Sequence, residues 1–127
     1  MDDRLAQFRK QQYLNVETFR KNGQGVPTPV WFVQDSDTLY VRTVDGSGKV
    51  KRIHHNPRVR VMPCSVRGEP RGEWVEGKAR FAGADESKRV NGPLTRKYSL
   101  VKVMFELMGK FQGRKYTVIA INETSEV

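Results

Sequence analysis

The sequence predicts a mainly β domain in which six antiparallel strands close into a small barrel flanked by a few helices. Six segments carry alternating or β-favouring residues, namely 13–19, 26–34, 38–43, 58–65, 73–82 and 115–122. Short connections between several of these segments favour antiparallel pairing. Most of the helical pattern comes late in the chain, which argues against a parallel sheet built from alternating strands and helices.

Clear turn signals separate the first three strands. Lys21-Asn22-Gly23-Gln24-Gly25 contains Asn-Gly, a pair that tolerates positive φ, and Asp35-Ser36-Asp37 is typical of a tight turn. Pro27 and Pro29 lack a backbone N–H. The first half of the second strand is therefore predicted not to be a fully bonded central strand.

Alternation predicts which side chains share a face in three strands. Leu39 and Val41 are expected to lie opposite Tyr40 and Arg42, and in the fourth strand the valines are expected to lie opposite the arginines. In the last strand the two faces are expected to be Tyr116, Val118 and Ala120 against Thr117, Ile119 and Ile121.

Helical patterns occur in four segments, at 2–11, 49–55, from Asp85 onward, and at 94–109. Val50 and Ile53 are expected to face inward from the second of these, which Asn56-Pro57 should end. Asn91-Gly92-Pro93 is expected to break or kink the third. The fourth carries an apolar stripe of Leu100, Met104, Leu107 and Met108, typical of a core or a dimer interface.

Composition fits a single domain over residues 1–127. Hydrophobic residues make up 37% of the chain and charged residues 29%, as in ordinary globular proteins rather than disordered ones. No apolar run approaches the roughly 20 residues that a membrane-spanning helix needs. The first residues are polar, unlike a signal peptide, and one cysteine, Cys64, cannot form an internal disulfide. We therefore expect a cytoplasmic protein.

The chain is basic, with 23 Lys and Arg against 14 Asp and Glu and a formal net charge of +9. Such a surplus favours an anionic partner, which can be nucleic acid, a membrane surface or a charged small ligand. Between Lys49 and Arg60 there are five basic residues and no acid. The positive charge is thus concentrated directly after the Gly46-Ser47-Gly48 loop.

This loop and its neighbours predict a phosphate site. Arg42 and Thr43 end a strand, Ser47 and Gly48 end the loop, and Lys49 begins a short helix. A phosphate is bound by hydroxyl and amide donors together with cations, and the start of a helix after a Gly-rich turn offers free N–H groups. The same pattern also occurs in solvated basic turns that bind nothing.

Several segments resemble the pyridoxamine 5′-phosphate oxidase-like split-barrel family, with agreement in order and spacing from about Tyr13 to Ile121. The similar segments are Val26-Pro27-Thr28-Pro29-Val30-Trp31-Phe32, Leu39-Tyr40-Val41-Arg42-Thr43, Ser47-Gly48-Lys49, Ile53, Asn56-Pro57-Arg58-Val59 and Glu76-Gly77-Lys78-Ala79. The likeness implies a split barrel that binds a flavin-type cofactor. It is closest to the deazaflavin-dependent branch, whose members use coenzyme F-420.

The resemblance also implies roles for individual residues. Thr43, Ser47 and Lys49 match the hydroxyls and the lysine around the cofactor phosphate, with neighbouring contacts at Arg42, Gly48 and, one helix step on, Lys51. Pro29, Val30, Trp31 and Phe32 match the strand that lies against the flavin ring, where backbone amides would contact the ring edge. A strand tryptophan is more often a core residue, and Trp31 can equally be one.

The implied activity is hydride transfer between FMN or coenzyme F-420 and a small organic substrate, in a homodimer with the cofactor at the subunit interface. Near Gly72 the FMN-dependent oxidases carry a glutamine that contacts the flavin, and residues 68–73 contain none. This departure and the surplus of positive charge after Lys49 favour the deazaflavin and its carboxylate tail over FMN. No residue is assigned as a catalytic acid or base.

Two other interpretations remain open at this point. The protein can bind or carry a flavin or haem without turnover, or it can be an RNA-binding barrel, although it lacks the aromatic–basic interleaving typical of RNA-reading sheets. A metal site is not expected, because adjacent residues such as His54 and His55 point about 100° apart on a helix. Cys64 has no identifiable base partner and is not expected to act as a nucleophile.

Overall fold

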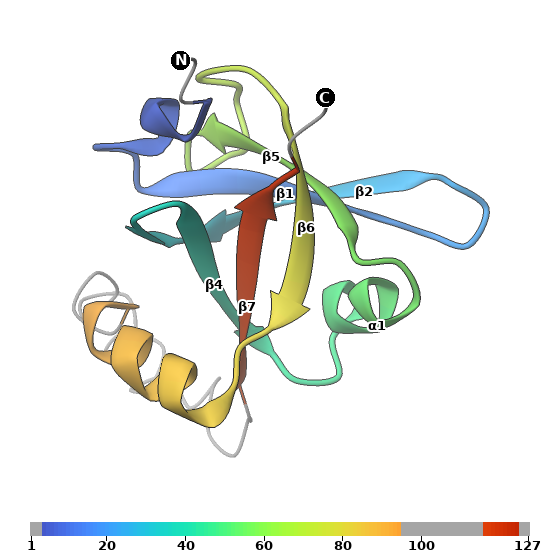
Figure 1. Cartoon of the computed structure of the whole chain (residues 1–127). Helices are drawn as coiled ribbons and strands as arrows, with labels where there is room; N and C mark the ends of the chain where they lie inside the picture. Colours follow the sequence, from blue (N-terminus) through green and yellow to red (C-terminus); the bar gives the residue numbers. More distant parts are fainter. Residues whose placement is uncertain (1–3, 95–115, 125–127) are drawn as a thin grey trace, which may run out of the picture.

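The computed structural model describes residues 4–94 and 116–124 and contains one strongly curled antiparallel sheet (Figure 1). Seven strands follow one another in the order β2-β1-β5-β6-β7-β4-β3. Their bounds are β1 Tyr13–Phe19, β2 Gly25–Trp31, β3 Val33–Asp35, β4 Thr38–Val44, β5 Arg58–Cys64, β6 Val75–Phe81 and β7 Tyr116–Glu123. A 3₁₀ helix, η1, spans Arg4–Phe8 and the helix α1 spans Gly48–His55. A further helix covers residues 84–94.

The predicted mainly β split barrel is confirmed, with seven strands in place of six. The predicted strand 26–34 is divided at Phe32 into β2 and β3, which form the two edges of the sheet. β2 pairs with β1 and β3 pairs with β4, so the chain crosses at Phe32 from one edge of the sheet to the other. The strand that carries Pro27 and Pro29 is thus an edge strand, as their missing N–H groups require.

An apolar core fills the inside of the curled sheet. It is formed by the inward faces of the strands, whose alternation agrees with the prediction for Leu39 and Val41, for Val59 and Val61, and for Ile119 and Ile121. Ile53 of α1 and Phe8 of η1 belong to the same cluster. Two short helices thereby contribute apolar side chains to the barrel core.

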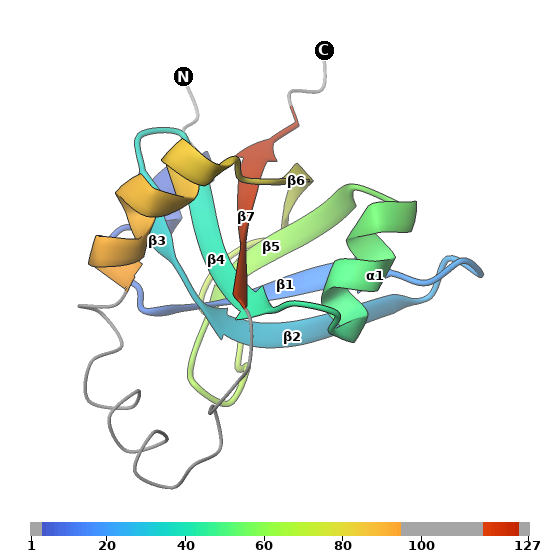
Figure 2. The ribbon, with the colours of Figure 1, turned by 90° about the horizontal axis from the view of Figure 1, so that it is seen from below.

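A second apolar cluster lies on the outer face of β4 and β7. Tyr40, Val118 and Ala120 pack there against Val90 and Leu94 of the helix over residues 84–94. Figure 2 shows this helix on the opposite side of the molecule from α1. Both faces of β4 are therefore buried, one in the barrel and the other under the helix.

Two helical expectations are corrected. Among the described residues of the predicted segment 2–11, Arg4–Phe8 form a 3₁₀ helix and residues 9–11 are not helical. Asn91-Gly92-Pro93 does not break the later helix, which continues to residue 94. Val90 and Leu94 are four residues apart and both buried against the sheet, so tertiary packing holds the helical turn over residues 91–94 in spite of the Gly-Pro pair. The predicted helix 94–109 lies outside the described residues beyond Leu94.

Ionic and hydrogen-bonded groups also hold the outer helix. Glu86 accepts hydrogen bonds from the hydroxyl of Tyr40 at 2.6 Å and from the guanidinium of Arg80 at 2.6 and 2.8 Å. Arg89 donates to Asp35 and to the Tyr40 hydroxyl. The bonds from Arg80, and next those from Tyr40, lower the pKa of Glu86 from 4.5 to about 2. Burial is the main cause of the raised pKa of Tyr40, followed by its bond to Glu86.

Glu86→Gln is expected to lower the free energy of unfolding by about 1–2 kcal/mol near neutral pH, because it removes charged acceptors from Arg80 and Tyr40. The folded-state pKa is depressed, so the carboxylate stabilises the fold above pH 4.5 and loses that effect as the pH falls toward about 2. Urea unfolding of both proteins across this range should show the difference narrowing with acid. The exposed Glu69→Gln is the control, and a difference that stays constant with pH would contradict the assignment.

In the part of the chain that the structure describes, no helix is long and apolar enough to cross a membrane.

Candidate functional site

The start of α1 is fixed by a capping residue and by the barrel core. Ser47 has extended backbone angles, φ −66° and ψ 166°, and its Oγ accepts a hydrogen bond from the N–H of Val50 at 3.4 Å. The N–H of Lys51 donates to the Ser47 carbonyl. Val50 and Ile53 are buried, so the inward face of the helix is anchored. The N–H groups of Gly48 and Lys49 are then those that the first turn presents to a ligand.

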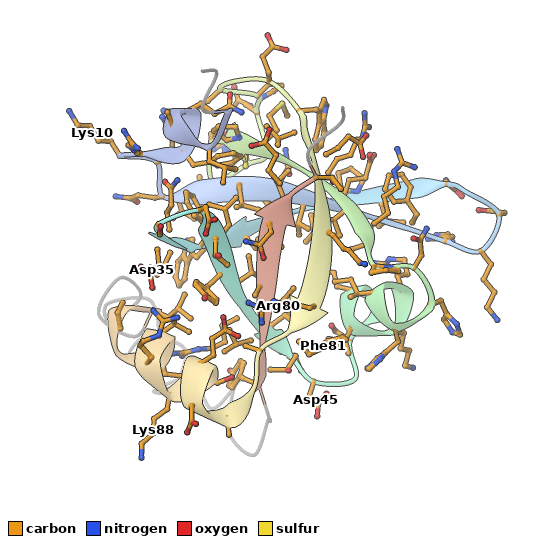
Figure 3. All side chains as sticks on the ribbon, in the orientation of Figure 1. Lys10, Asp35, Asp45, Arg80, Phe81 and Lys88 are labelled. Carbon is orange, nitrogen blue, oxygen red and sulfur yellow. The ribbon has the colours of Figure 1, made fainter. Side chains whose placement is uncertain are left out.

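Two cations lie side by side at this helix. Lys49 is half-buried, and its pKa is lowered mainly by burial and further by the positive charge of Arg52. Among the described residues no acid forms an ion pair with Lys49 or Arg52. Asp45, in the preceding loop, is exposed and points away from the molecule (Figure 3). The positive charges of Lys49 and Arg52 favour the binding of an anion at this helix start.

The structure brings Ser47, Gly48 and Lys49 together but directs Arg42 elsewhere. The guanidinium of Arg42 donates to the backbone carbonyl and the side-chain oxygen of Asn91, at 3.2 and 3.1 Å, on the outer helix. Thr43 is buried and is the next residue on the strand, so its side chain faces the other side of the sheet. Arg42 and Thr43 thus do not point at a common ligand through their side chains.

The four residues of the predicted ring-binding strand alternate between the two faces of the sheet. Val30 packs against the barrel core, and Phe32 is only 1% exposed within it. Trp31 lies on the outer face beside Tyr13, with ring centroids 5.9 Å apart, and Pro29 is exposed. The side chains of Val30 and Phe32 are therefore not available to a ligand, whereas those of Pro29 and Trp31 lie outside the barrel core, Trp31 against the second apolar cluster.

The basic run from Lys49 to Arg60 divides into two parts. Arg58 forms an ion pair with Glu76 and lies over the ring of Phe19, 4.5 Å from its centroid. Arg60 binds Glu17 at 2.7 Å. These two charges on β5 are neutralised within the fold, so the run offers less surplus charge for a carboxylate tail than the sequence indicates. Lys51 is exposed on α1.

The structure gives no catalytic or metal-binding surroundings to His54 or Cys64 among the described residues. The ring of His54 stacks on Phe81 with centroids 4.3 Å apart. In the described ranges no group of three or more His, Cys, Asp and Glu is placed to hold a metal ion. Cys64 is buried, and desolvation raises the pKa of its thiol, which disfavours the reactive thiolate.

Arg52 and Thr18 lie next to the candidate site, and the sequence did not single them out. Arg52 follows Lys49 by three residues, and this spacing places neighbours on one helix face, so the sequence did contain a signal for it. Thr18 belongs to β1, and nothing in the residues around it in the sequence indicates that it contacts α1. Its bond to Arg52 exists only because the fold brings α1 against β1.

The comparisons with known proteins agree with this architecture. The sequence profile of the pyridoxamine 5′-phosphate oxidase family matches residues 1–127. The single curled antiparallel sheet is a split barrel, the fold that this family shares. The chain belongs to the pyridoxamine 5′-phosphate oxidase family. A search of curated protein sequences found no match.

Solved structures share the fold at low sequence identity. A Listeria innocua structure assigned to pyridoxamine 5′-phosphate oxidase is 18% identical with a TM-score of 0.69, covering 95% of this chain and 90% of its own. HutZ, the haem storage protein from Vibrio cholerae, is 13% identical with a TM-score of 0.70, covering 95% and 87%. An F420 reductase is 16% identical with a TM-score of 0.62, covering 98% and 96%.

Proposed function

We propose that this protein is an oxidoreductase that holds FMN or the deazaflavin coenzyme F-420 by its phosphate arm at the start of α1. The observation that carries the proposal is the pair of cations, Lys49 and Arg52, beside the Ser47-capped first turn, with no acid of the described residues in an ion pair with either. The donor set fits a phosphoryl group, because it combines backbone N–H groups, a hydroxyl and two cationic side chains. Family membership supports the same ligand class.

The bound ring would supply hydride transfer, and the residues of this chain would bind and orient it. With the phosphate at α1, backbone groups of β2 would contact the ring edge, and the side chains of Pro29 and Trp31 would lie beside the ring. β2 is an edge strand, so its outer side is open to a second copy of the chain. We include in the proposal a cytoplasmic homodimer in which the partner covers the ring and excludes water.

Lys49→Ala is expected to weaken binding of the physiological cofactor by about tenfold or more, because it removes a charge-assisted contact from a half-buried site. The measurement is a fluorescence titration with FMN and, in parallel, with coenzyme F-420. Lys88→Ala is the matched control, since Lys88 is exposed on the outer helix and points away from the sheet (Figure 3). Its titration curve should coincide with that of the unmodified protein.

The proposal fails if the protein binds neither cofactor, or if Lys49→Ala and Lys88→Ala bind equally well. A higher affinity for one cofactor in the unmodified protein identifies which of the two it uses. Hydride transfer is then tested by mixing the loaded protein with electron donors and acceptors under anaerobic conditions.

A second candidate is a protein that stores or carries a ligand without turnover. The fold is shared with the haem storage protein HutZ, so the barrel itself is compatible with that role. Haem titration followed by absorbance separates the two functions. A bound flavin or haem that no donor or acceptor can reduce or oxidise would favour the carrier.

A further inference from the structure

Arg52 is held above the first turn of α1 by a residue from a distant strand. Its Nε donates a hydrogen bond to Oγ1 of Thr18 at 2.6 Å. Thr18 lies on β1 and is fully buried. A guanidinium has five N–H donors in a fixed plane, so one bond at Nε sets the direction of the remaining Nη groups. The tether therefore orients Arg52 before any ligand arrives.

Gly48 leaves the space in which the guanidinium lies. A Cβ at position 48 would come within 2.9 Å of Nη1 of Arg52, closer than real Cβ contacts allow. The φ angle of Gly48 is not positive, so backbone conformation does not require glycine here. A side chain at position 48 would therefore push the guanidinium of Arg52 out of the place it occupies.

The cost of this arrangement is electrostatic. Burial is the main cause of the lowered pKa of Lys49, and repulsion from the positive charge of Arg52 adds to it. Among the described residues no carboxylate forms an ion pair with either side chain. A fold that tethers a cation beside another cation gains from an anion that contacts both. A guanidinium also matches the paired oxygens of a phosphoryl group in geometry.

We propose that Arg52, oriented by Thr18 and accommodated by Gly48, is the second cation of the phosphoryl-binding site and contacts the phosphoryl group together with Lys49. This inference rests on the proposed function and adds to it a binding residue, a positioning residue and the reason for the glycine. The ligand chemistry is a phosphoryl anion, which FMN carries as a monoester and coenzyme F-420 as a diester.

The test compares ligands with and without the phosphate arm. Dissociation constants are measured by fluorescence for FMN against riboflavin, and for coenzyme F-420 against its deazaflavin lacking the phosphate arm. Arg52→Gln and Thr18→Val are expected to raise the dissociation constant of the phosphorylated ligand by about 10-fold to 100-fold. The dissociation constant of the ligand without phosphate should stay nearly unchanged. Thr18→Ser keeps the hydroxyl and is expected to retain most of the affinity.

Gly48→Ala supplies an independent variant. It should weaken binding of the phosphorylated ligand, because its Cβ displaces the flexible end of Arg52 without touching the core. In the background of Arg52→Gln the same substitution is expected to have little further effect, since the displaced group is already absent. Additive losses in the double variant would overturn the role of Gly48 in making room for Arg52.

Different outcomes separate the two proposals. If flavins bind in a manner that depends on Lys49 but not on Arg52, or if riboflavin binding falls equally in Arg52→Gln, this inference is wrong and the proposed function stands. If no flavin or deazaflavin binds, inorganic phosphate decides. If phosphate raises the melting temperature of the unmodified protein but not of Arg52→Gln, the phosphoryl site is supported and the proposed function is overturned. No effect of phosphate overturns both.

Discussion

Phe32→Ala is expected to lower the free energy of unfolding by about 3–5 kcal/mol, as large-to-small changes at buried aromatics do. Phe32 is 1% exposed and meets Phe8 edge-on, with ring centroids 5.7 Å apart and planes at 82°. It also marks the point where the chain passes from β2 to β3. Alanine would leave a cavity in the barrel core and loosen the contact that anchors η1.

Equilibrium unfolding in urea or guanidinium measures the effect, and Trp31→Ala is the comparison. Trp31 is larger but only half-buried on the outer face, so its loss is expected to cost less than that of Phe32. If Trp31→Ala proves the more destabilising of the two, Phe32 is not the core residue described here. The comparison bears on function as well, because a side chain buried in the barrel core is not available to a ligand.

Local alternation explains why the fold class and the faces of the strands could be predicted. A strand exposes alternate residues to opposite sides, so Leu39 and Val41 identify the barrel face of β4 from sequence alone. Pro27 and Pro29 likewise restrict β2 to an edge. These features depend on residues close together in the chain, where periodicity and missing donors are visible.

Features that depend on distant residues could not be predicted in the same way. No turn residue predicts the interruption at Phe32, because β2 ends and β3 begins with β-favouring residues on either side of it. Gly92 and Pro93 predict a helix break, yet the burial of Val90 and Leu94 against β4 and β7 overrides that preference. Tertiary packing decides both cases.

The candidate site shows the same division. Ser47, Gly48 and Lys49 lie in one loop and helix start, so the sequence could place them together. Arg42 carries the right charge, but Asn91 from the outer helix binds its guanidinium. Thr18 is 34 positions away from Arg52 in sequence, and only the fold brings the two into contact.

Gly77→Val is expected to destabilise the protein by about 3 kcal/mol, although valine favours strands and glycine does not. Gly77 lies in β6 with its neighbours on both sides, opposite Val59 of β5 and Glu123 of β7. A Cβ there would stand 3.0 Å from the backbone oxygen of Asn122 and 3.1 Å from Cγ2 of Ile121. A backbone oxygen in a paired strand cannot move aside, so the sheet itself must deform.

Lys78→Val is the matched control for Gly77→Val, because it adds the same side chain at the next position, which is exposed. Its effect on the free energy of unfolding should stay within about 0.5 kcal/mol. Gly77→Ala, which adds only the Cβ, should fall between the control and Gly77→Val in urea unfolding. A gain in stability from Gly77→Val would mean that strand propensity outweighs the close approach of β7. The glycine in Glu76-Gly77-Lys78-Ala79 would then need another explanation than packing.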